Sequence, residues 1–213
     1  MEPVTMRGFR LHALDPATAK CLSDGDLSTL EDAPNFSDIH ECVRDLARST
    51  SELYRKRRSV SPWLGYFCRD DSYRVVGTAA FVGPPAAGAV EIAYHTFPEF
   101  EGRGIATAMA EQLLEIARKA DPCLRVIGFT RPEQDASTRI LERIGFHQVG
   151  EGLDEAWRWE FSNPDARSEL RLARPQSAAE RLRGRLRGTA GRSRTAWPFR
   201  ACRDAGPWSG TRR

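Results

Sequence analysis

The stretch PEFEGRGIATAMAEQLL, residues 98–114, places two glycines at the mouth of a helix pattern. Beyond them, apolar residues recur at the spacing of one helical face, with Glu111 and Gln112 expected on the solvent side. Glycine weakens a helix interior by about 1 kcal/mol relative to alanine. Gly102 and Gly104 therefore suggest that something approaches the backbone closely where this helix begins. The stripe expected to pack on a sheet consists of Ala106, Met109, Ala110, Leu113, Leu114 and Ala117.

The segments on either side of this helix alternate between strand and helix patterns. Asp15 and Pro16 supply an N-cap and a first helical residue, and turn residues 70–72 separate two apolar runs in the manner of a hairpin. The predicted order is β-α-α-β-β-β-α-β-α-β-β, a mixed α/β domain that covers residues 1–162. The expected elements are strand 4–14, helices 17–22 and 37–57, hairpin strands 63–68 and 73–82, strands 89–94 and 124–130, a helix from 136 to 144 capped by Asp135 or Ser137, and closing strands 147–150 and 157–161.

The charge of the chain is unevenly distributed. Residues 163–213 carry 13 arginines, no lysine and 4 acidic residues, a net charge of +9, whereas residues 1–162 carry a net charge of −6. The arginine-rich stretch holds little apolar surface, so we expect it to be mostly disordered, with a short helix near residues 178–186. It is interpreted as a solvated extension or, alternatively, as a basic arm that binds nucleic acid.

Cysteine usage and hydropathy bear on where the protein works. The cysteines are odd in number and widely spaced, which is typical of reduced thiols rather than of disulfides or a zinc site. No apolar run resembles a signal peptide or reaches the ~20 residues of a membrane span. We therefore expect a cytoplasmic protein without a metal site or a membrane anchor. The five cysteines are Cys21, Cys42, Cys68, Cys123 and Cys202.

The element order and two motifs resemble the GNAT acyl-CoA N-acyltransferase superfamily. Its signature Q/R-x-x-G-x-G/A falls on residues 101–106, where Gly104 and Ala106 match and Glu101 replaces the usual Gln or Arg. The segment ASTRILERIGF, residues 136–146, is similar to the helix and Gly-Phe pair that precede the last hairpin of that family. The resemblance covers residues 5–162, and the EIAY strand and the helix of Ser137 are similar to the branch of ribosomal-protein N-terminal acetyltransferases. It implies a mostly antiparallel sheet flanked by helices and acetyl-CoA as co-substrate.

The signature residues have a physical interpretation as an anion site. Free N–H groups at a helix N-terminus attract phosphate, and small residues let a pyrophosphate reach the main chain. By resemblance, the pyrophosphate of coenzyme A is assigned to Gly102, Arg103, Gly104, Ile105 and Ala106. The alternative is that the two glycines only form a tight turn between strand and helix. Glu101 would repel a pyrophosphate by about 1 kcal/mol unless its side chain points to solvent.

Acetyl transfer requires a neutral amine, a polarised carbonyl and a proton for the leaving thiolate. Glu91 lies on the strand before the glycine turn and is the expected base; the alternative is a solvated or ion-paired strand carboxylate. The resemblance implies a backbone N–H near Ala93 or Tyr94 as the donor to the acyl oxygen.

For the thiolate proton, many family members use a tyrosine where this chain has Leu141. Ser137 is the remaining local hydroxyl, with helix capping as its alternative role. Gln134 stands where relatives often have an asparagine that contacts the coenzyme arm.

These residues predict an N-acetyltransferase whose acceptor is a primary amine on a small molecule or a protein N-terminus. His95 is a candidate for lining the acceptor site, and Trp157 and Trp159 are interpreted as core residues or as a wall of the acceptor pocket. One alternative is a GNAT-fold protein that binds acyl-CoA without transferring the acyl group. The other is a nucleic-acid-binding protein that acts through the arginine-rich tail, and the expected assembly is a monomer or a homodimer.

Overall fold

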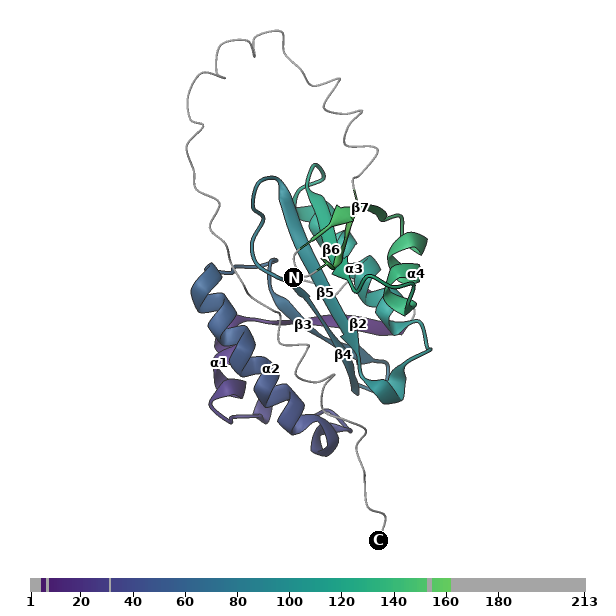
Figure 1. Cartoon of the computed structure of the whole chain (residues 1–213). Coiled ribbons are helices and arrows are strands. Elements are labelled where there is room, and N and C mark those ends of the chain that lie inside the picture. Colours follow the sequence, from purple (N-terminus) through teal and green to yellow (C-terminus); the bar gives the residue numbers. More distant parts are fainter. Residues whose placement is uncertain (1–4, 7, 31, 153–154, 162–213) are drawn as a thin grey trace.

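The computed structural model describes residues 5–6, 8–30, 32–152 and 155–161 (Figure 1). The described strands are β1 (Thr5–Met6), β2 (Phe9–Leu14), β3 (Gly65–Asp70), β4 (Val75–Phe81), β5 (Ala89–Thr96), β6 (Arg125–Thr130), β7 (His147–Glu151) and β8 (Trp157–Phe161). The helices are α1 (Pro16–Ser23), α2 (Phe36–Arg57), α3 (Ile105–Ala120) and α4 (Ala136–Arg143), with short 3₁₀ turns η1 (Ser28–Leu30) and η2 (Pro98–Phe100).

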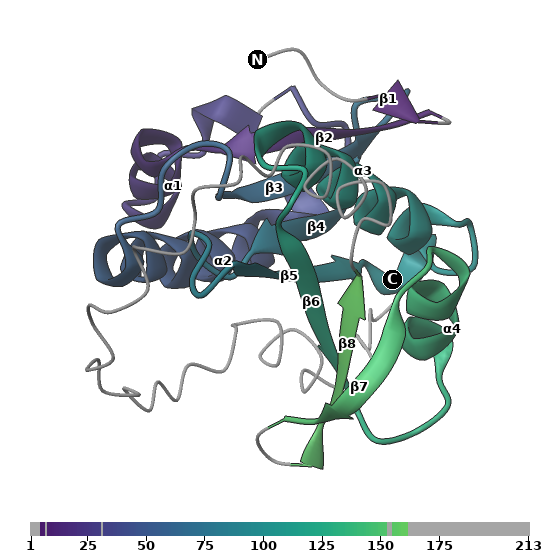
Figure 2. The same ribbon diagram turned by 90° about the horizontal axis from the view of Figure 1, so that it is seen from above.

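The strands form one sheet in the order β1-β2-β3-β4-β5-β6-β8-β7. Neighbouring strands run antiparallel except β5 and β6, which are parallel and connected through α3. In Figure 2 the strands β6, β8 and β7 lead away from the part of the sheet next to α1 and α2. The mixed α/β fold with a mostly antiparallel sheet is therefore confirmed.

The helices lie on both faces of the sheet (Figures 1 and 2). A Cβ at Gly65 in β3 would lie 3.3 Å from the hydroxyl of Tyr54 in α2, and one at Gly77 in β4 would lie 3.2 Å from Cε of Met109 in α3. Gly65 pairs with Ala80, three positions from Gly77, so the two glycines face opposite sides. We call these sides the α2 face and the α3 face.

The core fills the space between the helices and the sheet. Pro16 starts α1, and the Asp15 carboxylate accepts the N–H groups of Ala17 and Thr18, as the N-cap prediction required. Burying a large apolar side chain contributes about 1.5–3 kcal/mol. The largest fully buried side chains include Leu14, Leu22, Phe81, Ile105, Met109, Leu113 and Leu141.

The N-terminal strand differs from the single strand expected over residues 4–14. It is two strands, because the chain turns at Gly8, whose φ is 79°. Met6 then pairs with Phe9 in an antiparallel hairpin. Positive φ is accessible to glycine at little cost, which explains the turn at this position.

The expectation for Gln112 is wrong. The helical stripe that was predicted packs inward, but Gln112 is also fully buried in α3. Its side-chain amide donates to the carbonyl of Phe9 at 3.2 Å, and its Oε1 accepts the N–H of Leu11 at 3.2 Å. Both backbone groups belong to β2. Among the described residues, β1 pairs with Phe9 and Arg10 of this strand and does not reach Leu11. The buried amide thus completes the hydrogen bonding of this strand.

The arginine-rich stretch at residues 163–213, its expected helix and the domain boundary at Ser162 lie outside the described residues.

Candidate active site

The parallel pair of strands opens part-way along its length. Ala89, Val90 and Glu91 of β5 pair with residues 125–127 of β6, and the pairing ends at Glu91 and Ile127. Beyond this point β5 continues to Thr96 against β4, and β6 continues against β8. In the second half of β5, the backbone N–H and C=O groups on the side of β6 are therefore no longer paired with that strand.

The register decides which backbone groups these are. The N–H of Val82 donates to the carbonyl of Glu91 at 2.9 Å. In an antiparallel pair the hydrogen-bonded positions alternate, so Ala93 also directs its N–H toward β4, where it pairs with Ala80. Tyr94 directs its N–H the other way, toward the side from which β6 has separated. Of the two residues expected to donate to an acyl oxygen, Tyr94 is the one whose N–H faces the opening.

A loop of unusual backbone geometry joins β5 to α3. Gly102 and Gly104 have φ values of 74° and 77°, and a Cβ at either would meet no atom within 4 Å. Glycine is thus required by the left-handed backbone and not by a neighbouring protein group. The open space beside both residues leaves room for a ligand, so the turn and a close approach to the main chain are both compatible with the geometry.

The start of α3 leaves several N–H groups without a helical acceptor. Ala108 donates the first helical hydrogen bond, to the carbonyl of Gly104, and no side chain caps the helix. The N–H groups of Ile105, Ala106 and Thr107 precede that bond. With the positive end of the helix dipole they form a site suited to an anion.

Two positively charged side chains and one carboxylate accompany this loop. The guanidinium of Arg103 donates to the carbonyl of Glu99 at 3.1 Å and lies 5.4 Å from the ring centre of Phe100. Arg74 lies 5.3 Å from the same ring centre. Glu101 is exposed. An exposed carboxylate is screened by water, so its repulsion of a bound phosphate is weak.

Glu91 is half-buried on the α2 face, between Val82 of the preceding strand and Ile127 of β6. Burial raises the pKa of the Glu91 carboxyl, and the positive charge of Arg57 acts in the opposite direction. Within the described part of the chain Glu91 takes part in no salt bridge. A carboxylate with a raised pKa and no hydrogen-bonded cation has the properties of a general base.

Helix α4 lies on the α3 face, where a Cβ at Gly128 of β6 would lie 3.7 Å from Cδ1 of Leu141. Asp135 caps this helix by accepting the N–H groups of Ser137 and Thr138, and Thr138 completes a capping box. Capping is therefore the role of Asp135, which leaves the Ser137 hydroxyl outside the cap.

Gln134 and Tyr94 add polar groups near the same helix end. Gln134 is exposed, and its Oε1 accepts a hydrogen bond from the Thr138 hydroxyl at 3.3 Å. Burial raises the pKa of the Tyr94 hydroxyl, and the charge of Asp135 adds to this effect. The α4 N-terminus and Tyr94 thus share one neighbourhood on the α3 face.

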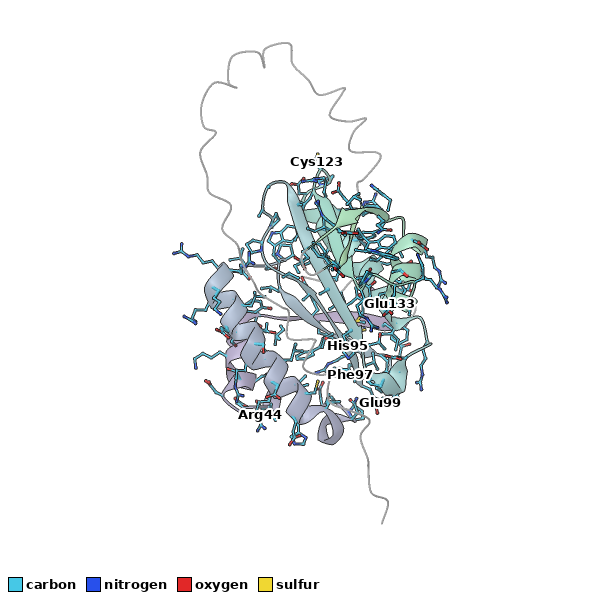
Figure 3. All side chains as sticks on the ribbon, in the orientation of Figure 1. Arg44, His95, Phe97, Glu99, Cys123 and Glu133 are labelled. Atoms are coloured by element: carbon cyan, nitrogen blue, oxygen red, sulfur yellow. The ribbon has the colours of Figure 1, made fainter. Side chains whose placement is uncertain are left out.

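The remaining candidate residues, His95 and the two tryptophans, lie on opposite faces of the sheet. His95 lies on the α2 face, four residues after Glu91 on the same strand, with its ring centre 6.1 Å from that of Phe97. Figure 3 shows His95, Phe97 and Glu99 following one another from the end of β5 into the loop. Trp159 pairs with Gly128 and so points to the α3 face, where it is buried and donates to Thr130 at 2.9 Å.

Trp159 is thus a core residue, whereas Trp157, which points the same way, is half-buried and packs against the edge of the core. The residue that sequence reasoning missed is Arg57 at the end of α2. Nothing local marks it, because it stands in the basic run 55–58 and lies far from Glu91 in the chain.

Three general properties of the described residues complete the picture. No helix among them has the length and hydropathy needed to cross a membrane. They contain no group of three or more His, Cys, Asp or Glu side chains that could hold a metal ion. Cys21, Cys68 and Cys123 are free thiols.

A family profile matches the part of the chain that carries this fold and this loop. The profile described as "Acetyltransferase (GNAT) domain" matches residues 4–147, which is more than half of the chain. The chain belongs to the GNAT acetyltransferase family. The resemblance seen in the signature at residues 101–106 is thereby confirmed, together with the acyltransferase class that it implies. No curated protein matches the chain in sequence.

Solved GNAT structures share the fold at low sequence identity. A ribosomal-protein-S5-alanine acetyltransferase from Vibrio fischeri is 14% identical with a TM-score of 0.54, over 78% of this chain and 98% of that chain. A GNAT-family acetyltransferase from Bacillus anthracis is 14% identical with a TM-score of 0.52, over 76% of this chain and 99% of that chain. RimL, a ribosomal alpha-N-protein acetyltransferase solved with coenzyme A, is 17% identical with a TM-score of 0.52, over 76% of this chain and 98% of that chain. At these identities the likeness shows the fold alone.

Proposed function

We propose that this GNAT protein transfers the acetyl group of acetyl-CoA to a primary amine by direct attack in a ternary complex. The observation that supports this best is the placement of Glu91 and Tyr94 on one strand, where the pairing of β5 with β6 ends. A half-buried carboxylate lies on the α2 face, and the Tyr94 N–H is directed into the opening beside it. A base and an oxyanion donor are the two groups that amine acylation requires.

The coenzyme is assigned to the loop before α3 and to the opening between the strands. The N–H groups of Gly102, Arg103, Gly104, Ile105 and Ala106, which lie in the loop and the first turn of α3, are assigned to the pyrophosphate. The Arg103 side chain adds positive charge at this loop. Gln134, at the α4 N-terminus, is assigned to the arm that leads to the thioester.

The proposed reaction uses groups of β5 and one hydroxyl of α4. The amine nitrogen attacks the carbonyl carbon, the carbon–sulfur bond breaks, and Glu91 takes the proton that the nitrogen loses. The Tyr94 N–H donates to the carbonyl oxygen as negative charge develops there, and the Ala93 N–H holds the strand in register with β4. The Ser137 hydroxyl, which the Asp135 cap leaves unused, supplies the proton that the departing thiolate takes up. Glu91 then loses its proton to water and Ser137 regains one, so that both groups return to their starting states.

The acceptor is proposed to be an amine of a small molecule or of a protein N-terminus. Supporting the second choice, solved structures with this fold include acetyltransferases that act on ribosomal proteins. Residues 1–162 are proposed to form the transferase domain and residues 163–213 a separate basic tail, in a monomer or a homodimer.

The test is amine-dependent release of coenzyme A thiol from acetyl-CoA, with the acetylated product identified by mass spectrometry. A panel of peptides with free N-termini and of small primary amines should contain at least one acceptor that gives both signals. Tight acetyl-CoA binding without turnover on any amine would instead support an acyl-CoA-binding protein, an outcome that the absence of a hydroxyl at Leu141 would explain. Salt-dependent nucleic-acid binding with no affinity for acetyl-CoA would support the tail as the functional part.

A further inference from the structure

A pocket of about 370 Å³ lies beside the glycine loop, at the end of the sheet where β4 begins and β5 has ended. Its walls come from three segments: the residues that precede α2, the residue that precedes β4, and residues 99–103 between β5 and α3. The volume lies in the range of small-molecule sites. The proposed reaction gives this pocket no role. It is lined by Pro34, Asn35, Arg74, Glu99, Phe100 and Arg103.

The ring of Phe100 gathers two positive charges at this pocket. Phe100 is buried, and the guanidinium carbon of Arg103 lies over its ring, 5.4 Å from the ring centre. The guanidinium carbon of Arg74 lies over the same ring at 5.3 Å. An aromatic ring attracts a guanidinium that lies over its face, but two like charges held on one ring also repel each other. An anion that contacts both guanidiniums would relieve that repulsion.

The hydrogen bonds of the two arginines differ. Arg74 directs Nε to Oδ2 of Asp70 at 2.8 Å and Nη2 to the same oxygen at 2.7 Å, so these bonds leave its Nη1 unused. Arg103 donates through Nη2 to the carbonyl of Glu99 at 3.1 Å. Within the described part of the chain Arg103 takes part in no salt bridge. Of the two positive charges, that of Arg103 is therefore the one that no carboxylate pairs with there.

Two further lining residues bear on what the pocket accepts. Asn35 donates to the carbonyl of Val75 at 2.8 Å and accepts the N–H of Val75 at 3.1 Å, which ties the start of α2 to β4 and fixes this wall. Glu99 is exposed, and its carboxylate opposes a bound anion, although water screens its charge. Binding of an anion here therefore depends on direct contact with the guanidiniums.

We propose that this pocket binds a phosphate monoester through the guanidiniums of Arg74 and Arg103. Such a group carries a charge of about −2 at neutral pH and three acceptor oxygens. Planar guanidinium groups match phosphate oxygens in geometry as well as in charge. A phosphate monoester occurs on the ribose of coenzyme A, and it also occurs in small phosphorylated ligands. The two sources share the chemistry that the pocket recognises.

The position of the pocket relates it to the coenzyme. Arg103 stands between Gly102 and Gly104, whose N–H groups are assigned to the pyrophosphate, so for coenzyme A the inference rests on the proposed function. The pocket adjoins that loop on the side of β4, whereas the opening assigned to the thioester lies on the side of β6. A coenzyme whose pyrophosphate lies at the start of α3 can therefore direct its thioester arm to one side and its ribose phosphate to the other.

The test measures binding to the full chain by isothermal titration calorimetry with three probes. They are acetyl-CoA, acetyl-CoA that lacks the 3′-phosphate, and adenosine 3′-monophosphate, which carries the phosphate monoester without the pyrophosphate. If the phosphate is that of coenzyme A, its removal should weaken binding of the thioester by about tenfold. If it belongs to a separate ligand, the two thioesters should bind equally, and adenosine 3′-monophosphate should bind without being displaced by acetyl-CoA.

Variants connect either result to the pocket. Arg103→Gln and Arg74→Gln should each remove most of the effect of the phosphate on affinity, and Glu99→Gln should enlarge it because a negative charge is lost. Arg118→Gln is the matched control, since it removes the same charge from the exposed last turn of α3 and should leave the effect unchanged. If Arg74→Gln fails to fold because its bonds to Asp70 are lost, Arg103→Gln and Glu99→Gln decide.

Two results overturn the proposal. One is equal affinity for the two thioesters together with no binding of adenosine 3′-monophosphate, and the other is an effect of the phosphate that persists in Arg103→Gln. Either result in a protein that binds acetyl-CoA and transfers its acetyl group contradicts the pocket assignment alone. A chain that binds adenosine 3′-monophosphate through Arg103 but neither thioester contradicts the proposed function and supports the pocket.

Discussion

Glu91 and Ile127 are the last residues at which the parallel strands β5 and β6 are paired. On one side of this pair the strands share backbone hydrogen bonds, and on the other the Tyr94 N–H faces an opening. The proposed base therefore lies at the edge of the proposed acyl site, because the end of the pairing places both on β5. This arrangement requires no catalytic side chain to be held by a long loop.

The activity should depend on pH through Glu91. Burial raises the pKa of this carboxyl and Arg57 partly opposes the effect. The base works when ionised, so kcat/KM should fall as the pH drops through this raised pKa, at a higher pH than for an exposed glutamate. A pH profile of kcat/KM for acetyl-CoA, measured with the amine acceptor at saturating concentration, checks this. An acid limb in the ordinary range of an exposed glutamate would speak against a half-buried base.

Gly104→Val should weaken acetyl-CoA binding by about tenfold or more, a loss of about 1.4 kcal/mol. Valine strains the left-handed backbone at this residue and fills the open space beside the α3 N-terminus. Isothermal titration calorimetry with acetyl-CoA measures the affinity.

The control for this variant is Gly25→Val. Gly25 also has a positive φ, 93°, and a Cβ there meets no atom within 4 Å, but it lies in the turn after α1. Both variants should lose about 1–2 kcal/mol of stability, and only Gly104→Val should lose affinity. Equal affinities in two folded variants would refute the assignment of the loop to the pyrophosphate.

Ser137→Ala should lower kcat by about 10²-fold or more if its hydroxyl protonates the thiolate. The free energy of unfolding should stay within about 0.5 kcal/mol of the parent, because Asp135 and not Ser137 caps α4. Asp135→Ala is the comparison, since removing the cap should cost about 1 kcal/mol. Stopped-flow detection of thiol release and urea unfolding measure the two quantities. An unchanged kcat in Ser137→Ala would assign the proton to another donor.

Gln112→Met should destabilise the fold by about 2–4 kcal/mol, because it leaves the N–H of Leu11 and the carbonyl of Phe9 without their side-chain partner. Urea unfolding followed by fluorescence checks this. Arg118→Met on the exposed side of the same helix should change stability by less than about 0.5 kcal/mol. Similar stabilities for the two variants would mean that the buried amide contributes little.

Much of the fold was predictable because its signals are local. The apolar stripe of α3, the Asp15-Pro16 start of α1 and the hairpin around residues 70–72 each depend on residues close together in the chain. Gln112 was misplaced because the groups that it bonds are 101 and 103 residues away. Helical periodicity reports which side of a helix is apolar, and it cannot show that a polar residue at the margin has a buried partner.

The candidate site was predictable to the same limit. The glycine loop could be predicted from its residue types, and the positive φ values of its glycines agree with that composition. The choice between Ala93 and Tyr94 depends on the register of β4 with β5, which the sequence does not encode at any single position. The cap of α4 was left between Asp135 and Ser137 because both residue types cap helices. Arg57 acts on Glu91 across the tertiary fold, where no spacing rule applies.

The most direct test of the proposed chemistry is Glu91→Gln, with acetyl-CoA affinity and amine-dependent thiol release measured on the same preparation. The account predicts an affinity within about twofold of the parent, because Glu91 lies on the α2 face away from the α3 N-terminus, and a loss of about 10²–10⁴-fold in kcat. Turnover equal to that of the parent in the folded variant would contradict Glu91 as the base and with it the proposed mechanism.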